Sequence, residues 1–248
     1  GWCLLVLVLK KRNLLACGLL CCFFAGFAAL RWTGHGKSLP AFAAFGGEAV
    51  TLVIDPGHGG EDGGAVSADG AVKESGLNLS IALRVEDLMT FLGQPTVMTR
   101  REDVSIHSQE AATARQKKVS DLHNRVALVN GTEGAVLLSI HQNSLPSSTV
   151  THGAQVFWNQ QEGAEELAEA IQTALNSTVN VGNEKHTKRI PPTVYLMKHV
   201  TVPAVLVECG FLTNREETAL LQDETYQRTL AISIAAGYLR GTSEGEIP

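Results

Sequence analysis

Residues 50–60 of the chain, VTLVIDPGHGG, decide the fold that we expect. The first half, Val50–Ile54, is a short apolar run of the kind that forms a buried strand. An Asp-Pro-Gly sequence at residues 55–57 then favours a turn directly after the strand. The stretch therefore predicts a buried strand that opens, at its carboxyl end, into a glycine-rich turn around His58.

Strand-like and helical patterns alternate through the rest of the chain. Further strands are predicted over Pro95–Thr99, Ala135–Ile140, Gly153–Trp158, Val194–Met197 and Ala204–Val207. Helices are predicted over Gly76–Leu92, Asp121–Asn130, Ala164–Leu175 and Tyr226–Leu239, and a further helix is capped by Asn214. Residues Arg100–Val119 are predicted to form a polar loop. Three of the strands are apolar on both faces, which is typical of parallel strands covered by helices. The pattern predicts a single α/β domain, built on a twisted, mostly parallel sheet with helices on both faces.

The N-terminal region differs in composition from the rest of the chain. Three consecutive cations at residues 10–12 precede an uncharged, mostly apolar stretch, Leu14–Leu30. A basic flank before an apolar run of about 17 residues is typical of a signal peptide or a signal anchor. We therefore expect an export signal or membrane anchor with a linker at residues 1–48, the globular domain at 49–241, and a disordered tail at 242–248.

Charge and cysteine content narrow the classes of function. Residues 1–45 hold five cations and no acid, so the remaining residues carry 15 cations against all 25 acids. A domain this acidic lacks the positive surface that binds nucleic acid. Four of the five cysteines also lie in the N-terminal part, which leaves Cys209 alone in the domain. An exported domain with one cysteine forms no internal disulfide, so its stability comes from its core.

Four ionisable residues stand at the ends of predicted elements. His58 follows the first strand, and His141 and Glu208 follow two other apolar strands. Glu74 stands just before the first long helix. Because the carboxyl ends of parallel strands meet at one edge of the sheet, where ligands bind, we expect these side chains to lie close together.

Two histidines and one carboxylate form the ligand set of a catalytic zinc ion with an open position for water. Zinc lowers the pKa of such a water to about 7, so that hydroxide is available at neutral pH. A further carboxylate beside the metal can act as general base and acid. With two histidines and two glutamates in suitable places, the sequence predicts a hydrolytic zinc site.

Each of the four residues also has an ordinary structural interpretation. His58 sits among glycines, as in a phosphate-binding loop, although the stretch lacks a Lys-Ser/Thr pair and a G-x-G-x-x-G pattern. His141 fits a hydrogen-bonded core residue, and Glu74 fits an acid favoured by a helix dipole. Glu208 is the hardest to explain in this way, because a carboxylate after an apolar strand is costly to bury without a partner or a metal.

Four motifs resemble those of a known enzyme family, the zinc-dependent N-acetylmuramoyl-L-alanine amidases of the amidase_3 group. The first comprises residues 53–60 (VIDPGHGG) with 62–65 (DGGA). Glu74 lies 16 positions beyond His58, matching the glutamate ligand of the family, and the motifs of the second histidine and of the catalytic glutamate are matched by residues 139–143 (SIHQN) and 207–214 (VECGFLTN). The likeness runs from about Leu52 to Arg240.

A subgroup of the family is a closer match. Residues 98–100 (MTR) and 195–197 (YLM) resemble the germination-specific amidases of endospore-forming bacteria. This subgroup implies a role in spore cortex maturation, with an activating lipoprotein or accessory protein as a partner. It also implies an exported chain, anchored in the cytoplasmic membrane or secreted across it, that acts in the cell wall or the spore intermembrane space.

The family resemblance implies a reaction and a role for each site residue. His58, Glu74 and His141 would hold Zn²⁺ in the catalytic domain, residues 49–241. Glu208 would take the proton of the attacking water and pass it to the leaving amine. The bond hydrolysed would be the amide between N-acetylmuramic acid and L-alanine in peptidoglycan.

Two other functions stay open. One is a zinc-containing wall-binding domain without activity, against which the intact Glu208 argues. The other is a metallopeptidase that cuts the stem peptide itself, because the choice of bond depends on the shape of the pocket. Arg100 and Arg125 have two interpretations, contacts to substrate carboxylates or structural ion pairs, and we expect the second. Cys209 lies beside a carboxylate, which disfavours a thiolate, so we expect it to pack in the core.

Overall fold

The structure is a computed structural model, and it describes residues 50–244 of the chain, without the side chain of Glu244. Its six strands are β1 (Thr51–Pro56), β2 (Thr96–Met98), β3 (Ala135–Asn143), β4 (Gln155–Trp158), β5 (Lys188–Arg189) and β6 (Ala204–Phe211). They form one sheet in the order β2-β1-β3-β6-β4-β5. All neighbouring strands are parallel except β4 and β6, which are antiparallel. The mostly parallel sheet predicted from the sequence is confirmed.

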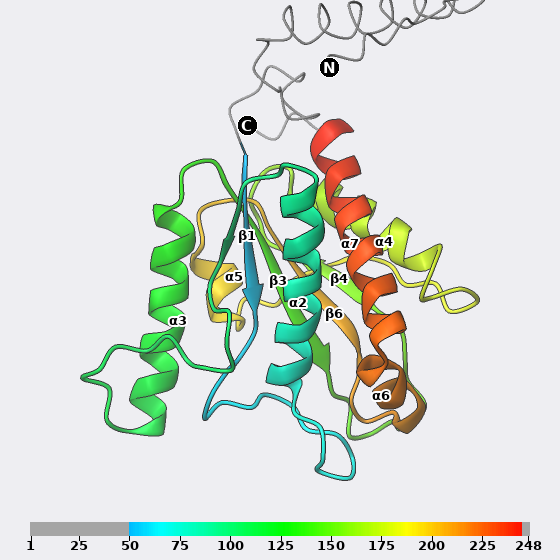
Figure 1. Cartoon of the computed structure of the whole chain (residues 1–248), viewed down its shortest axis with the longest axis horizontal. Coiled ribbons are helices and arrows are strands. Elements are labelled where there is room, and N and C mark those ends of the chain that lie inside the picture. Colours follow the sequence, from blue (N-terminus) through cyan, green and yellow to red (C-terminus); the bar gives the residue numbers. More distant parts are fainter. Residues whose placement is uncertain (1–49, 245–248) are drawn as a thin grey trace, which may run out of the picture. The chain divides into compact units, whose positions relative to one another are not determined.

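Helices cover both faces of this sheet (Figure 1). They are α2 (Glu74–Phe91), α3 (Ala114–Gly131), α4 (Ala164–Asn176), α5 (Tyr195–His199), α6 (Arg215–Gln222) and α7 (Glu224–Glu244). Leu52 and Ile54 of β1 pack in the cluster that includes α2, α4, α6 and α7, whereas Val53 packs in the cluster of α3 and α5. Successive side chains of a strand point to opposite faces, so β1 is buried on both, as its apolar sequence predicts.

The carboxyl ends of β1, β3 and β6 lie at one edge of the sheet. These three strands are adjacent and parallel, and the loop between β1 and α2 passes over this edge, at the bottom of Figure 1. Both β3 and β6 run further than the apolar runs predict, to Asn143 and Phe211. His141 and Glu208 therefore lie inside the strands and are paired neighbours, which places them more firmly than a loop would.

The prediction of a strand over Val194–Met197 is wrong. Val194 caps the helix α5, and the other three residues form its first turn. A short apolar run does not distinguish a strand from a turn of buried helix. In the helix, the adjacent Leu196 and Met197 are both buried against the α3 side of the sheet, whereas a strand would send them to opposite faces.

The polar loop predicted over Arg100–Val119 ends earlier than expected, since α3 begins at Ala114. Thr113 and Gln116 form a capping box, in which each side chain accepts from the backbone N–H of the other. The first turns of α3 are mostly exposed and therefore show no apolar period, so the cap was the only local signal of the helix start. At the other end of the chain, α7 continues to Glu244, so residues 242–244 are helical and do not belong to a disordered tail.

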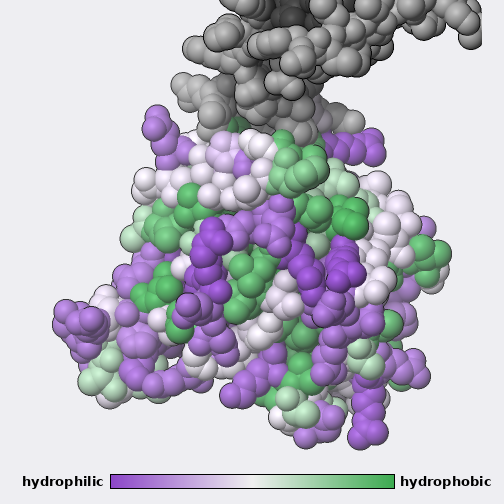
Figure 2. All heavy atoms as spheres, viewed as in Figure 1, coloured by the Kyte–Doolittle hydropathy of each residue, from purple (hydrophilic) through white to green (hydrophobic). Residues whose placement is uncertain are grey.

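Hydrophilic and hydrophobic side chains are interspersed over the face of the domain that Figure 2 shows. Between residues 50 and 244, no helix combines the length and the apolar character needed to cross a bilayer. The predicted export signal or anchor, within residues 1–48, lies outside the described residues.

Candidate metal centre

The turn after β1 brings His58 against β3 through an unusual backbone shape. His58 has a φ of 61°, in the left-handed region that residues other than glycine seldom adopt. Gly57 lies against the imidazole of His141, and a Cβ at this position would overlap that ring. The absence of a side chain at residue 57 is what lets the two histidines approach each other, with ring centroids 5.1 Å apart.

Two buried arginines hold the carbonyl groups of this turn. Arg125 donates to the carboxylate of Asp55 at 2.5 Å and to the carbonyl oxygen of His58 at 2.7 Å. Arg100 donates to the carbonyl oxygen of Gly57 at 2.9 Å. Because only 2% of Arg125 and 3% of Arg100 is exposed, neither is available to substrate carboxylates. The structural ion pair expected for Arg125 is confirmed by its bridges to Asp55 and Asp121, whereas the recorded contacts of Arg100 are hydrogen bonds to backbone carbonyl oxygens.

Glu74 is the first residue of α2 and is almost fully buried. Its carboxylate accepts hydrogen bonds from the backbone N–H groups of Ala65 (2.7 Å) and Gln142 (3.1 Å). Burial acts to raise the pKa of Glu74, but His141 and His58 and the Ala65 N–H outweigh it and lower the pKa to about 2. The helix N-terminus also favours the charge, so Glu74 is an ionised carboxylate at neutral pH.

His141 presents one ring nitrogen to this carboxylate. Its Nδ1 lies 2.9 Å from Glu74 Oε1, while the rest of the ring rests against Gly57. Burial acts to lower the pKa of His141, but the negative charges of Glu74 and Glu208 outweigh it and raise the pKa above its ordinary value. This surplus of negative charge is what a cation at the site would compensate.

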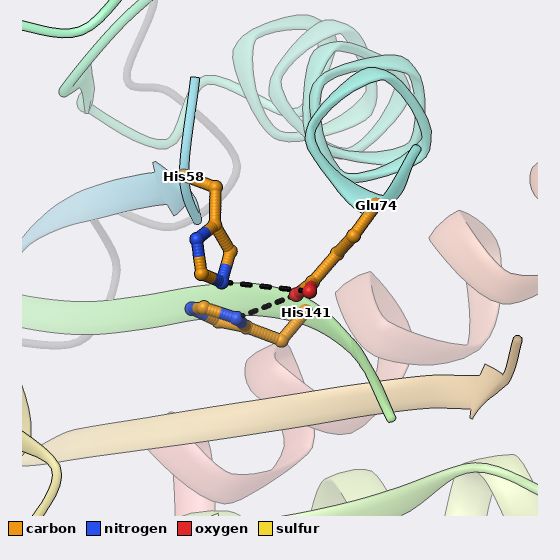
Figure 3. Close-up of side chains that lie close together, drawn as sticks. All are labelled: His58, Glu74 and His141. Carbon is orange, nitrogen blue, oxygen red and sulfur yellow. Dashed lines mark hydrogen bonds and ion pairs between the residues drawn. The ribbon is translucent and has the colours of Figure 1, made fainter. Parts of the chain in front are cut away.

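Ligand atoms from His58, Glu74 and His141 all lie within 4.8 Å of one another. The side chains converge from the turn after β1, the start of α2 and the end of β3 (Figure 3), with His58 Nε2 3.4 Å from Glu74 Oε2. Ligand atoms of a tetrahedral zinc ion lie about 3.3 Å apart, since each is about 2.0–2.1 Å from the metal. The donor set and its spacing therefore fit zinc, and the part of the chain that the structure describes contains no second group of this kind.

Glu208 lies beside this group, on β6 and opposite His141 in the strand pairing. Its Oε2 atom is buried and has no hydrogen-bond partner among residues 50–244. Burial raises the pKa of Glu208 to about 7, an effect that Glu74 increases and His141 opposes. A carboxyl group with a pKa near neutrality is suited to accept a proton and then release it.

Three polar residues around the group were given no role from the sequence: Asp62, Asn78 and Gln142. Asn78 donates a hydrogen bond to Glu74 Oε1 at 3.2 Å, and its Oδ1 accepts one from Gln142 Nε2 at 3.1 Å. Asp62 Oδ2 lies 3.0 Å from His58 Nδ1. Two of the contacts are local, because Asn78 follows Glu74 by one helical turn and Asp62 follows His58 by four residues. Gln142 lies on β3, so its contact with Asn78 depends on how the strand packs against α2.

The structure also tests the alternative roles considered for His58 and Cys209. Carboxylates flank His58 on two sides, at Asp62 and Glu74, which argues against a phosphate-binding loop. Cys209 is a free, fully buried cysteine, and burial together with the charge of Glu208 raises the pKa of its thiol. The packing role expected for Cys209 is confirmed.

Comparison with known proteins agrees with this geometry. Residues 52–240 match Amidase_3, the N-acetylmuramoyl-L-alanine amidase family. The chain belongs to this family. The germination-specific N-acetylmuramoyl-L-alanine amidase of Bacillus subtilis is 36% identical over 198 residues, which cover 79% of this chain and 82% of that protein. The hydrolysis of the amide between N-acetylmuramic acid and L-alanine in peptidoglycan is therefore the activity of this enzyme.

Two solved amidases share the fold. The CwlD amidase of Clostridioides difficile, in complex with the GerS lipoprotein, superposes with a TM-score of 0.76 at 35% identity, over 79% of this chain and all of that one. An N-acetylmuramoyl-L-alanine amidase of Clostridium difficile 630 has a TM-score of 0.68 at 30% identity, over 78% of this chain and 97% of its own. Both likenesses extend across the whole described domain rather than a single motif.

Proposed function

We propose that this amidase is zinc-dependent, that His58, Glu74 and His141 hold the metal, and that Glu208 is its general base and acid. The observation that carries the proposal is the convergence of three ligand atoms within 4.8 Å. They lie next to a carboxyl group with a buried oxygen that has no hydrogen-bond partner among residues 50–244. Three protein ligands would leave one coordination position for water, as in catalytic zinc sites, and Glu208 lies opposite His141 in the strand pairing.

Zinc, when bound, supplies a Lewis acid that polarises the amide carbonyl and acidifies water. Glu208 takes a proton from the attacking water as a bond forms between the water oxygen and the carbonyl carbon of the lactyl group. The same carboxyl group then gives that proton to the nitrogen of L-alanine as the carbon–nitrogen bond breaks. The products are the glycan carboxylate and a stem peptide with a free amino end.

The relatives support a proposal for the biological setting. The 36% identity to a germination-specific amidase supports a role in spore cortex maturation, and the amidase solved with a lipoprotein supports an accessory protein as partner. Action outside the cytoplasmic membrane is supported by the peptidoglycan substrate and by the basic and apolar sequence of residues 10–30. Cell fractionation tests this location, and a chain found only in the cytoplasm would contradict it.

The first experiment identifies the bond that is cut. The whole chain is incubated with purified peptidoglycan and zinc, and the soluble products are analysed by mass spectrometry. We expect free stem peptides that begin with L-alanine. Shortened stems would contradict the amidase activity, and equal release of stem peptides in the presence of a zinc chelator would contradict the proposed zinc dependence.

The second part of the experiment separates the roles of the two glutamates. Glu208→Gln should keep its zinc and lose activity by about 10²–10⁴-fold, because glutamine cannot accept the proton of water. Glu74→Gln should bind zinc more weakly, because a neutral amide replaces an anionic ligand, and excess zinc should restore part of its activity. Zinc content and released stem peptide are measured for both variants. Loss of zinc in Glu208→Gln, with rescue by added metal, would mean that the two roles are reversed.

A further inference from the structure

The two ring nitrogens of His58 face different partners. Nε2 lies 3.4 Å from Glu74 Oε2, inside the group of candidate ligands, and Nδ1 lies 3.0 Å from Asp62 Oδ2. A histidine binds a metal through a nitrogen that carries no proton, so a ring bound through Nε2 carries its proton on Nδ1. That N–H then donates to the carboxylate of Asp62.

Asp62 is itself fixed by contacts on several sides. Its backbone pairs with that of Gly59, with N···O distances of 2.9 and 3.3 Å. The side chain accepts from the backbone N–H of Gly64 through Oδ1 (3.3 Å) and contacts Lys118 Nζ through Oδ2 (3.2 Å). Lys118 belongs to α3, so the carboxylate connects the turn after β1 to a helix on the opposite face of the sheet from α2.

His58 depends on this contact more than His141 does. The ring of His141 is confined by Gly57 on one side and by Glu74 on the other. The side chains of His58 and His141 are similarly exposed, at 22% and 20%. His58, however, lies in a loop on a left-handed backbone, and its second ring nitrogen, Nδ1, faces Asp62. A carboxylate at Nδ1 fixes both the tautomer and the plane of the ring.

We propose that Asp62 is a positioning residue of the metal centre, which holds His58 with Nε2 directed at the metal and thereby strengthens metal binding. This inference rests on the metal site of the proposed function. It assigns a role to Asp62, which does not reach the candidate ligand position itself, and to the ion pair with Lys118 that supports it.

The chain offers a matched control one residue away. Glu61 also forms an ion pair with α3, through Lys117 Nζ at 2.5 Å, but its side chain is 68% exposed and the contacts that the structure records for it do not include His58. Asp62→Ala and Glu61→Ala therefore remove the same charge from the same loop, and only the first removes the partner of the histidine. Asp62→Asn is the conservative variant, because its amide oxygen can still accept from Nδ1.

The experiment measures zinc affinity directly, by competition with a chromogenic chelator, on the whole chain of each variant. We expect the zinc dissociation constant to rise about 10–100-fold for Asp62→Ala, the range typical of lost outer partners of metal-bound histidine. Asp62→Asn should recover part of this loss, and Glu61→Ala should stay within about twofold of the original chain. The absorption spectrum of the cobalt-substituted protein should change for Asp62→Ala and not for Glu61→Ala, because it reports the ligand geometry.

Thermal unfolding of the metal-free variants separates positioning from folding. If Asp62→Ala is unfolded without metal, Asp62→Leu, which keeps the bulk of the side chain but has no acceptor for Nδ1, decides the question by the same two measurements. Zinc affinity and cobalt spectrum equal to those of the original chain in the deciding variant, or an equal loss in Glu61→Ala, would overturn the inference. None of these readouts needs peptidoglycan, so the inference stands even if the chain does not cut the proposed substrate. Likewise, a loss of zinc affinity in Asp62→Ala cannot be mistaken for the choice of a wrong substrate.

Discussion

Gly57 shows how one missing side chain shapes the metal centre. The imidazole of His141 occupies the space where a Cβ of residue 57 would lie, and the two histidines meet because of this contact. At Gly76, in the first turn of α2, no neighbouring atom of residues 50–244 lies within 4 Å of the corresponding position. The two glycines therefore differ in what they allow, although neither has a positive φ.

Substitution of these glycines should give opposite results. Gly57→Ala must displace the His141 ring, and a shift of this kind of about 1 Å costs about 100-fold in rate. Gly76→Ala should leave the rate unchanged and raise the free energy of unfolding by about 0.5–1 kcal/mol, since alanine suits a helix better than glycine. Release of stem peptide and urea unfolding measure the two effects. A Gly57→Ala enzyme with the original rate would show that the His141 ring has room that the structure does not indicate.

At the scale of elements, α3 and β1 are joined by a buried ion pair. Arg125 on α3 contacts Asp55 at the end of β1 at 2.5 Å, with side chains that are 2% and 1% exposed. Arg125 also bonds to Asp121 one turn earlier at 2.7 Å. These bonds lock the helix against the strand that leads to His58, so that the position of the helix determines the position of the turn.

Substitution of Arg125 should therefore lower the free energy of unfolding substantially. Arg125→Met leaves Asp55 buried without its charge partner, which typically destabilises a fold by about 3–5 kcal/mol. Arg228→Met is the control, because its bridge to Glu224 on α7 joins side chains that are 59% and 70% exposed, and such pairs contribute about 0.3–0.5 kcal/mol. Chemical denaturation of both variants gives the two values. Equal losses would mean that the buried pair contributes no more than a surface pair.

For the molecule as a whole, the buried carboxylates at the sheet edge predict how stability depends on pH. Burial acts to raise the pKa of Asp55, but Arg125 and the hydroxyl groups of Ser139 and Thr99 outweigh it and hold the pKa below its ordinary value of 3.8. A carboxyl group whose pKa is lower in the folded state stabilises the fold above the unfolded-state pKa. That contribution is lost as the pH falls through the folded-state pKa.

The metal-free chain should accordingly lose free energy of unfolding as the pH falls below about 3.8. Glu74, with a pKa of about 2, contributes in the same direction. Asp55→Asn should be less stable at neutral pH and should show a shallower loss on acidification, because one of the titrating groups is gone. Urea unfolding at stepwise lower pH measures both curves. An identical acid slope in the two proteins would show that Asp55 is not a source of the pH dependence.

The sequence by itself determined the class of fold, the family and the four residues on which the proposal rests. Apolar runs of strand length and apolar residues at helical spacing are local properties, so they predict β1, β3, β6 and the long helices without tertiary information. The Asp-Pro-Gly-His turn and the glutamates at Glu74 and Glu208 are equally local, because each stands directly beside such a run.

Only the tertiary structure decided how these parts act together. The contact of Arg125 with the carbonyl of His58 and the ring of His141 over Gly57 join groups from different elements. The wrong strand at Val194–Met197 has the same origin, since burial against α3 rather than local pattern selects the helix. A contact between residues that are about 70 positions apart leaves no periodic trace in the chain, because it depends on where the whole sheet brings its edges together.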